Sequence, residues 1–512
     1  MSAPANPPMG PAGRGRDAVH RDRARLVPFR YRAVGDAYVL TNDFGRYAMV
    51  DAETFLRLVQ GRIGPEDPAW PQLQAAWFVA EALDRDAVVA QTAERSRFLR
   101  SGPNLHILVV TLRCNHTCQY CHASRAPMHH THTDMSIETA ERSVDFAFQS
   151  PSPSLTLEFQ GGEPLANWPV VEHIIEYALQ KNALARKSVM FSLVSNLSLM
   201  DDAKLDYLID RRVQICTSLD GPPAVHDAVR KWSDGASHDT TVRWMARINQ
   251  RYRDQGLDPN LYRVEALPTI TRLVLDDPEG LLDHYVTVGC RSIFLRHLDP
   301  FGWAATTKAR LGYTMAEFLD FYARAYHHVI ELNRRGTDFV ERTMALLVAK
   351  VIGNFEPNFL DLRSPCGAGI GQIAYNSDGR LFTCDEGRMV DRGGDDCFCL
   401  GDVASTAYRD AIAGPQVRAM VLASALDGQP HCATCAYKPW CGVCPVHNYC
   451  EQGSLHGRMA DSTWCQKYMG LFDFLMGRLQ VADAFERSVL QRWATPRRQD
   501  HFVQEGGGPG QG

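Results

Sequence analysis

Apolar and polar positions alternate along the middle of the chain in two different rhythms. Six apolar runs of strand length occur between residues 105 and 298, namely LHILVVTL, LTLEFQ, VMFSLVSN, VQICTSLD, RVEALPTIT and SIFLRHL. The segments between them have the apolar spacing of helices, namely SIETAERSVDFAFQ, PVVEHIIEYALQKN, DDAKLDYLIDR, TTVRWMARINQRYR and PEGLLDHYVTVG. Strands that alternate with helices form a parallel sheet covered by those helices. The pattern predicts an α/β fold over residues 104–335, a partial (β/α)6 barrel with its site at the carboxyl ends of the strands.

The flanking segments have other patterns. Residues 26–100 alternate apolar and polar positions over LVPFRYRAVGDAYVLTNDFGRYAMVD and then acquire helical spacing, which predicts a small α+β domain. Residues 1–25 are rich in Pro, Gly, Ala and Arg without periodicity, and we expect a disordered leader. Residues 336–480 form a cysteine-rich domain. Residues 481–512 are expected to contain a helix and a disordered Gly-rich tail.

Composition narrows the class of function. The chain has 512 residues, and 54 Lys and Arg stand against 59 Asp and Glu. The net charge of −5 does not favour nucleic acid or an anionic membrane as a partner. No run of about 18 apolar residues occurs, so no membrane-spanning helix is predicted. The first residues contain no apolar signal segment, and we expect a cytoplasmic protein.

Cysteines are numerous and unevenly placed. In a large chain without an export signal, clustered thiols indicate metal ligands or catalytic groups rather than disulfides. Cys216 and Cys290 lie alone in apolar segments and are expected to be core residues. The other thirteen of the fifteen form two clusters, at 114, 118 and 121 and between 366 and 465.

The first cluster follows the first predicted strand with the spacing Cys114-x3-Cys118-x2-Cys121. Three thiolates on one loop suit an iron–sulfur cluster or a zinc ion. Zinc would need a fourth ligand, which His116 or His122 could supply. A [4Fe–4S] cluster held by three cysteines would instead leave one iron open to a substrate or cofactor.

This spacing after the first strand resembles the signature of the radical S-adenosylmethionine (SAM) superfamily. The resemblance implies that a reduced [4Fe–4S] cluster cleaves SAM and that the resulting 5′-deoxyadenosyl radical takes hydrogen from a substrate. It also implies a SAM-binding set at the strand ends. In the family, the GGEP motif binds the methionine amino group, and here it is Gly161, Gly162, Glu163 and Pro164. The strand-end residues that contact the ribose and the carboxylate correspond to Ser195, Asn196, Ser218 and Asp220. Arg230 corresponds to the arginine that pairs with the SAM carboxylate, and Tyr120 to the aromatic residue near the adenine.

Glycines let a ligand approach the backbone, and a carboxylate can accept from an ammonium group. For Ser195 and Ser218, ordinary capping of strand ends is the alternative.

The second cluster resembles the SPASM domain, which holds two auxiliary [4Fe–4S] clusters. The resemblance implies an outer set and an inner set of ligands, namely Cys432, Cys435, Cys441 and Cys465, and Cys366, Cys384 and Cys444. The fourth inner position is either open or filled by Cys397, Cys399 or Cys450. The CGVC segment departs from the family, which has three residues between these cysteines rather than two. A zinc ribbon built from the two CxxC pairs is the alternative.

Two smaller features bear on chemistry. Asp385 corresponds to a catalytic aspartate of sulfatase-maturing relatives, where a base would take a proton from the substrate; an ordinary turn residue is the alternative. His129, His130 and His132 lie in a polar loop and are expected to be solvated rather than metal-bound.

The strings LTNDFGRYAMVD, LHILVVTLRCNHTCQYCHASR, SPSPSLTLEFQGGEPLANW and CAYKPWCGVCPVHNY resemble the B-type radical SAM maturases of His-Xaa-Ser peptide systems. This implies a precursor peptide with His-x-Ser repeats, a flavodoxin- or ferredoxin-type electron donor and a second radical SAM maturase. Residues 26–100 resemble a leader-peptide recognition domain, which binds an extended peptide by strand addition. A generic accessory domain is the alternative.

We expect hydrogen abstraction at a side-chain β-carbon, followed by an oxidative intrapeptide crosslink of cyclophane type. Epimerisation, thioether formation and side-chain oxidation stay open. A non-catalytic peptide-binding protein and an electron-transfer module are the alternatives from other classes.

Overall fold

The computed structural model describes residues 26–357, 360–391, 393–495 and 497–506. The chain divides into two compact units, residues 1–92 and 93–512. The predicted leader, residues 1–25, lies outside the described residues.

The first unit is a small meander with helices. Its antiparallel sheet has the order β1 (Arg30–Val34), β2 (Ala37–Thr41) and β3 (Tyr47–Asp51). Helix α1 (Ala52–Val59) begins where Asp51 accepts a hydrogen bond from Thr54 N at 2.7 Å, and α2 (Trp70–Ala75) follows. The apolar face of the sheet and α1 bury a core that includes Leu40, Phe55 and Phe78.

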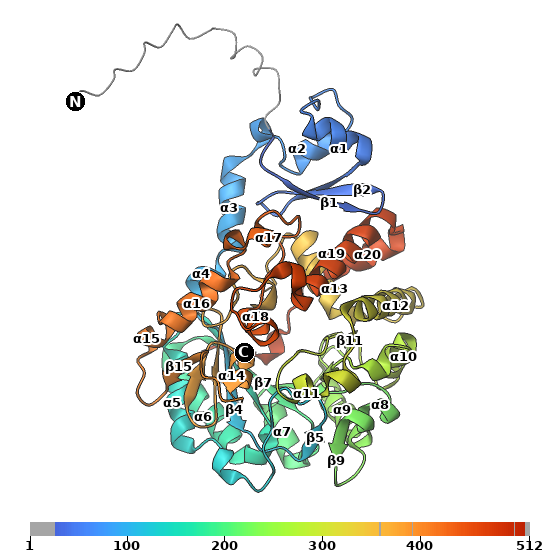
Figure 1. Ribbon diagram of the computed structural model, residues 1–512. Helices are drawn as coiled ribbons and strands as arrows, with labels where there is room; N and C mark the ends of the chain where they lie inside the picture. Colours follow the sequence, from blue (N-terminus) through green and yellow to red (C-terminus); the bar gives the residue numbers. More distant parts are fainter. Residues whose placement is uncertain (1–25, 358–359, 392, 496, 507–512) are drawn as a thin grey trace, which may run out of the picture. The chain divides into compact units, whose positions relative to one another are not determined.

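The second unit is built on one mixed sheet. Six strands run parallel in the order β10, β8, β7, β6, β4 and β13, and the helices between them lie outside the strands (Figure 1). The bounds of the parallel strands are Glu265–Leu267, Gln214–Ser218, Ser188–Ser195, Ser154–Gly161, Leu105–Thr111 and Gln372–Tyr375. The crossover helices are α5 (Ile137–Phe148), α6 (Trp168–Ala185), α7 (Asp202–Asp210), α8 (Pro223–Val229), α9 (Ser237–Asp254) and α10 (Pro278–Thr287). The predicted α/β architecture is confirmed.

The last predicted strand is shorter than its apolar run. Strand β11 (Ser292–Ile293) pairs with β12 (Val340–Glu341), outside the main sheet. Beyond it, an isolated bridge pairs Thr269 with Arg296, and Ile270 N donates to Arg296 O at 2.9 Å. Two short strands, β5 (His116–Cys118) and β9 (Arg230–Trp232), form a separate antiparallel pair.

The main sheet continues across the boundary predicted at residue 335. Strand β13 pairs parallel with β4, and β14 (Arg380–Phe382) and β15 (Cys399–Asp402) extend it antiparallel. Strand β16 (Val503–Gln504) pairs antiparallel with β7, within the segment predicted to be a disordered tail. The glycine-rich residues 507–512 lie outside the described residues.

Helices carry the rest of the C-terminal half. They are α11 (Trp303–Leu311), α12 (Met315–Arg334), α13 (Arg342–Val351), α14 (Asp385–Asp391), α15 (Tyr408–Ile412), α16 (Pro415–Ser424), α17 (Pro430–Ala433), α18 (Pro445–Gln452), α19 (Thr463–Val481) and α20 (Ala484–Trp493). Helix α12 begins with a capping box between Thr314 and Glu317.

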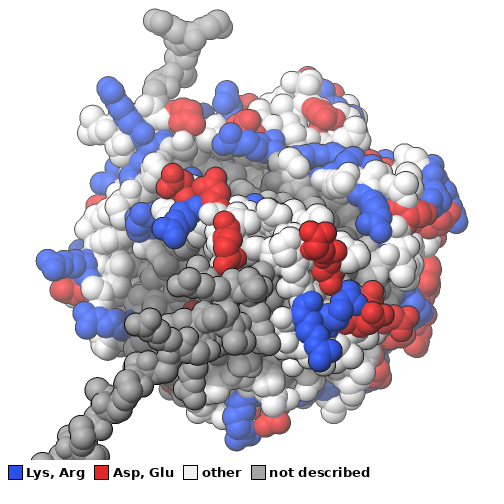
Figure 2. Space-filling view, turned by 90° about the horizontal axis from the view of Figure 1, so that it is seen from above, with Lys and Arg blue, Asp and Glu red and all other residues white. Residues whose placement is uncertain are grey.

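Surface charge is mixed. On the face drawn in Figure 2, basic and acidic side chains are interspersed, and neither sign forms a continuous stretch. None of the helices in the described residues combines the length and the apolar character needed to cross a bilayer.

Candidate active site

The first cysteine loop follows β4 and turns back beside β9. Pairing of β5 with β9 sets Cys118 opposite Arg230. Burial raises the pKa of Cys118 to about 11, with Arg230 opposing the rise and Cys121 adding to it. Burial also raises the pKa of Cys114, and Cys118 and Cys121 raise it further. The three predicted ligands are therefore close enough to act on one another.

The GGEP turn packs against this loop through its backbone. Gly162 N donates to Thr111 O at 2.9 Å, and Glu163 N donates to Arg113 O at 2.7 Å. A Cβ on Gly161 would lie 2.0 Å from Thr111 O, and one on Gly162 would lie 2.3 Å from Arg113 O. The two glycines are therefore needed for close contact between the backbones of two segments, in addition to the predicted approach of a ligand.

Glu163 is buried, and both of its carboxylate oxygens accept hydrogen bonds. Ser195 Oγ and Leu165 N donate to one oxygen at 2.7 and 3.1 Å, and Asn196 N donates to the other at 2.8 Å. Burial raises the pKa of Glu163 to about 7, against the effect of these donors. The carboxylate joins the end of β6 to the end of β7 and brings Ser195 and Asn196 next to GGEP. Pro164 begins the short helical turn that follows.

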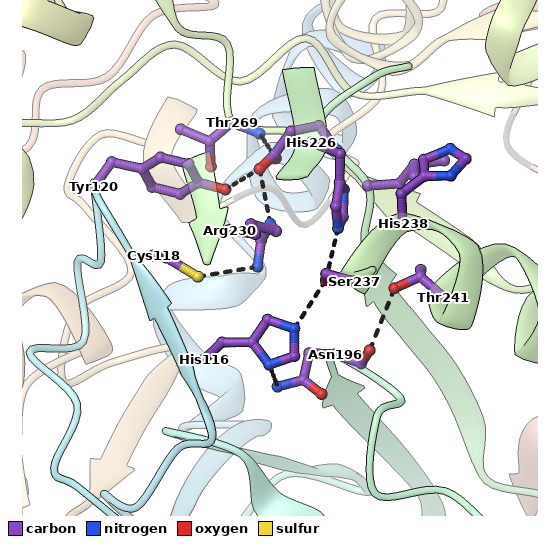
Figure 3. Close-up of polar contacts among 12 residues, drawn as sticks. His116, Cys118, Tyr120, Asn196, His226, Arg230, Ser237, His238, Thr241 and Thr269 are labelled. Atoms are coloured by element: carbon purple, nitrogen blue, oxygen red, sulfur yellow. Dashed lines mark hydrogen bonds and ion pairs between the residues drawn. The ribbon is translucent and has the colours of Figure 1, made fainter. Parts of the chain in front are cut away.

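Asp220, at the end of β8, accepts hydrogen bonds from three donors, which belong to the labelled residues Tyr120, Arg230 and Thr269 in Figure 3. Arg230 Nε donates to its Oδ2 at 2.7 Å, the Tyr120 hydroxyl donates to the same oxygen, and Thr269 N donates to Oδ1 at 3.0 Å. The Arg230 guanidinium lies 5.4 Å from the centre of the Tyr120 ring, and its Nη1 is 3.7 Å from Cys118 Sγ. Three predicted SAM contacts thus meet beside the cysteine loop.

A buried polar chain that the sequence did not indicate supports this region. His116 Nε2 and His226 Nε2 lie 2.8 and 2.9 Å from Ser237 Oγ (Figure 3). Asp220 N donates to His226 Nδ1 at 3.2 Å, and Asn196 Nδ2 lies 3.0 Å from His116 Nδ1. Burial lowers the pKa of His116 to about 4 and that of His226 to about 3, so both rings are neutral near pH 7. Ser237 lies 121 positions from His116, so no local pattern could have revealed the pair.

A second group of thiols lies beside β13 and β14, the strands that extend the main sheet beyond β4. Cys366 precedes β13, Cys384 follows β14, and Cys444 caps α18, its sulfur accepting from His447 N at 3.4 Å. All three cysteines are buried, and burial raises the pKa of Cys366 to about 12. Burial raises the pKa of Cys384, and Glu386, Cys444 and Cys366 raise it further. The predicted inner set is brought together.

The third group comprises Cys432, Cys435, Cys441 and Cys465, which line one pocket. Burial raises the pKa of Cys441, and the three other thiols raise it further. The CGVC turn thus places Cys441 in this group and Cys444 in the inner one, despite its shorter spacing.

The remaining cysteines have different surroundings. Cys397 and Cys450 are exposed, and Cys399 on β15 lies with its sulfur 3.6 Å from Gly401 O. No contact joins these three cysteines to the inner set among the described residues. The fourth inner position therefore stays a prediction, either open or filled by one of them. Cys290 is buried, and Cys216 is half-buried on β8.

Other predicted residues are placed as follows. Asp385 is buried, and its Oδ1 accepts from Arg388 Nε at 2.7 Å, so it is an ion-paired side chain rather than an exposed turn residue. Ser218 is half-buried, and its hydroxyl makes no hydrogen bond within the described residues. The loop histidines at 129, 130 and 132 are exposed or half-exposed.

The donor sets fit the cofactors that the resemblance implies. Thiolates are the usual ligands of [4Fe–4S] clusters, and the structure brings ten cysteines together as groups of three, three and four. In the part of the chain that the structure describes, no three His, Cys, Asp or Glu side chains converge as they would around a single metal ion.

Part of the chain matches a known family. Residues 108–258 match the model of the Radical SAM superfamily. An uncharacterized protein of Methanocaldococcus jannaschii is 26% identical over 129 residues, and the Radical SAM cyclopropyl synthase TigE of Paramaledivibacter caminithermalis is 24% identical over 158 residues. These matches cover 25% and 28% of this chain and 42% and 33% of the relatives' own lengths.

Longer matches extend into the C-terminal half. A cysteine-type anaerobic sulfatase-maturating enzyme of Clostridium perfringens is 21% identical over 400 residues, which cover 74% of this chain and 98% of the relative. The structure of native anSMEcpe with bound AdoMet superposes with a TM-score of 0.60 at 17% identity, over 76% and 99% of the two chains.

Streptococcus suis SuiB bound to precursor peptide SuiA superposes with a TM-score of 0.51 at 13% identity, over 86% and 99%. Residues 108–258 therefore match the Radical SAM superfamily, and the α/β fold around them resembles that of native anSMEcpe.

Proposed function

We propose that the protein is a radical SAM peptide maturase that installs an oxidative intrapeptide crosslink in a ribosomally made precursor. The supporting observation is that Cys114, Cys118 and Cys121 meet the GGEP turn, Asp220 and Arg230 at the carboxyl ends of the parallel strands. The neighbours whose names or titles refer to a peptide or a maturation reaction support the substrate class.

In this proposal the three cysteine groups hold three [4Fe–4S] clusters, one that binds SAM and two auxiliary ones. When bound, SAM and its cluster would supply a carbon radical that takes a hydrogen atom from an unactivated C–H bond. The auxiliary clusters would supply an acceptor for the electron left on the substrate. Arg230 pairs with the SAM carboxylate, and Tyr120 lies near the adenine. Glu163 holds the turn that receives the methionine amino group through its bonds to Ser195 and Asn196.

Forming the crosslink removes two hydrogen atoms from the peptide. One leaves as a hydrogen atom, and the other leaves as a proton and an electron. We assign the proton to Asp385, next to the inner cysteine Cys384, with Arg388 holding its carboxylate at 2.7 Å. The product should be two hydrogen atoms lighter than the precursor, whereas an epimerised product would have unchanged mass and an oxygenated one would be heavier.

The partners follow from the same proposal. The substrate is a precursor peptide with His-x-Ser repeats, whose leader is bound by the first unit. The electron donor is of flavodoxin or ferredoxin type, and a second radical SAM maturase acts on the same peptide.

Anaerobic reconstitution tests the proposal. Three clusters predict about twelve irons per chain, falling to about eight in the variant Cys114→Ala/Cys118→Ala/Cys121→Ala, which should also lose SAM cleavage. Cys216→Ala, a thiol on β8 outside the three groups, is the matched control and should keep the iron content of the wild type. About four irons, with zinc in the C-terminal half, would contradict the auxiliary clusters. Full iron without SAM cleavage would favour a peptide-binding or electron-transfer role.

A further inference from the structure

The segments around the first cysteine loop contain basic residues and no acidic ones. Residues 112–133 contain the loop itself, residues 228–233 contain β9, and residues 300–316 contain α11. None of these segments has an Asp or Glu, although the whole chain has more acidic than basic residues and a net charge of −5. The surroundings of the loop are therefore opposite in charge to the protein as a whole. The basic residues of the three segments are Arg113, Arg125, Arg230, Lys231, Lys308 and Arg310.

Helix α11 and strand β9 are hydrogen-bonded directly to this loop. Trp303 N, at the start of α11, donates to Cys121 O at 2.9 Å, and Thr307 Oγ1 donates to Gln119 O at 3.1 Å. Gln119 N in turn donates to Val229 O at 2.9 Å, one residue before β9. The two elements therefore flank the segment between the second and third cysteines of the loop.

Three basic side chains of these two elements are exposed, namely Lys231 on β9 and Lys308 and Arg310 on α11. Lys231 lies opposite Thr117 in the pair of β5 and β9, and Arg310 Nη2 donates to Gln119 Oε1 at 2.6 Å. None of the three forms an ion pair within the described residues. We call these three residues the basic patch.

The acidic residues that border the three segments have other partners. Glu317 pairs with an arginine at 2.9 Å, and Asp227 Oδ1 accepts from His238 N at 2.9 Å. Asp234, in the turn after β9, accepts from the hydroxyl of the preceding serine at 2.7 Å. Since none of these carboxylates pairs with the basic patch, its charge faces solvent.

The basic patch lies where the first cysteine group comes close to the surface. Cys118 and Cys121 are half-buried, whereas every cysteine of the inner group is buried. Thr117, next to Cys118 and opposite Lys231, is exposed. A protein that docks on the basic patch would therefore lie beside the loop that carries these thiols.

We propose that the basic patch is the docking surface of a small acidic electron-carrier protein, which delivers one electron to the first cluster. The inference rests on the cluster assigned under the proposed function, and it names the surface that receives the electron donor. Opposite charges steer two proteins together and fix their orientation, and weak electron-transfer complexes have small interfaces. The carrier loses one electron and the oxidised cluster gains it, so no bond forms or breaks and no proton moves.

Reduction of the reconstituted full-length protein by an acidic flavodoxin, followed by stopped-flow absorbance, tests this. Lys231→Glu/Lys308→Glu should lower the second-order rate constant about tenfold or more at low ionic strength, and added salt should reduce the difference from the wild type. The dissociation constant of oxidised flavodoxin, measured by isothermal titration calorimetry, should rise in the same variant. Reduced methyl viologen, a small cation, should reduce this variant at least as fast as the wild type.

Arg409→Glu/Arg418→Glu is the matched control. It makes the same change in net charge at two exposed side chains on α15 and α16, which Figure 1 draws apart from α11 and β9. Its rate with flavodoxin should stay close to that of the wild type. Lys231→Gln/Lys308→Gln removes the charge without adding repulsion, and its rate should lie between those of the wild type and the charge-reversed variant.

Equal rates with flavodoxin in the wild type and Lys231→Glu/Lys308→Glu would overturn the inference. An equal loss in the control would overturn it too, because net charge and not the basic patch would then decide the rate. If the charge-reversed variant loses iron, the glutamine variant decides: slower reduction by flavodoxin alone supports the inference, and an unchanged rate overturns it. An iron content that does not fall in Cys114→Ala/Cys118→Ala/Cys121→Ala would instead refute the first cluster of the proposed function, so the two failures are distinguishable.

Discussion

Two buried carboxylates organise the residues at the strand ends. Glu163 and Asp220 each accept hydrogen bonds from three donors, and these donors include four of the residues predicted to contact SAM, namely Ser195, Asn196, Tyr120 and Arg230. The predicted contacts are therefore held in place by one another before any ligand is considered. Preorganisation of this kind lowers the entropy that binding must overcome.

The raised pKa of Glu163 gives a measurable pH dependence. Because burial raises it from 4.5 to about 7, the protonated form is favoured by folding. The stabilisation is complete below about pH 4.5 and is lost as the pH rises through about 7, which amounts to about 3 kcal/mol. In Glu163→Gln this dependence should be absent, so the stability of the iron-free wild type relative to this variant, measured from urea midpoints, should fall by up to about 3 kcal/mol between about pH 5 and pH 8. Glu138→Gln, on the exposed first turn of α5, should follow the wild type. If the urea midpoints of the wild type and Glu163→Gln change with pH in parallel, Glu163 is ionised in the folded protein over this whole pH range, which would contradict the raised pKa.

At the scale of elements, the close approach of β6 to the cysteine loop depends on two glycines. A methyl group at Gly161 would lie 2.0 Å from Thr111 O, at a backbone φ of +139° that L residues rarely adopt. Gly161→Ala should therefore destabilise the protein by about 3 kcal/mol or more and lower the iron bound by the first cysteine group. Gly64→Ala, where nothing lies within 4 Å of the added carbon, should change neither the melting temperature nor the iron content. Normal iron content and stability in Gly161→Ala would mean that the backbones at Gly161 and Thr111 can move apart without loss of folding free energy, which would contradict this prediction.

Elements are also where prediction from the sequence succeeds and fails. The strands with long apolar runs, such as Leu105–Thr111 and Ser188–Ser195, were predicted to within one or two residues, because burial on both faces leaves a continuous local pattern. The contacts of β13 and β16 were not predicted. Pairing of Gln372–Tyr375 with β4 spans about 267 positions, and only tertiary contact decides it. The grouping of the cysteines was implied by resemblance to known cysteine patterns, whereas the partners of Glu163 and Asp385 were not predicted, because a sequence pattern does not tell which donor a carboxylate meets.

At the scale of the second unit, one sheet links the first cysteine loop to the inner group. Strand β4 leads into Cys114, β13 pairs with β4, and β14 leads into Cys384. A hydrogen-bonded ladder thus fixes the separation of the two groups more rigidly than a linker between independent domains would. The segment that carries Cys384 is in this sense an extension of the main sheet.

The first unit has its own sheet, in which β1 pairs with one strand, β2, among the residues that the structure describes. Its hairpin turns at Gly35 and Asp36, so Val34 and Ala37 form the closing pair. Alternation along the antiparallel ladder then points the N–H groups of Tyr31 and Ala33 away from β2. Both side chains are exposed, and among the described residues no second strand pairs with this edge, which is the arrangement that strand addition requires.

Ala33→Pro tests whether the precursor leader binds there. Proline removes the outward N–H of Ala33 but leaves the bonds to β2, since an edge position accepts proline on its open side. The affinity for a synthetic His-x-Ser precursor, measured by fluorescence anisotropy, should fall at least tenfold, because main-chain bonds supply much of the affinity in strand addition. Ala33→Val keeps the N–H and suits a strand, so it should bind as the wild type does. SAM cleavage without peptide should be equal in all three proteins. Equal affinity of the proline and valine variants would exclude this edge, and the leader would then have to be recognised elsewhere on the chain.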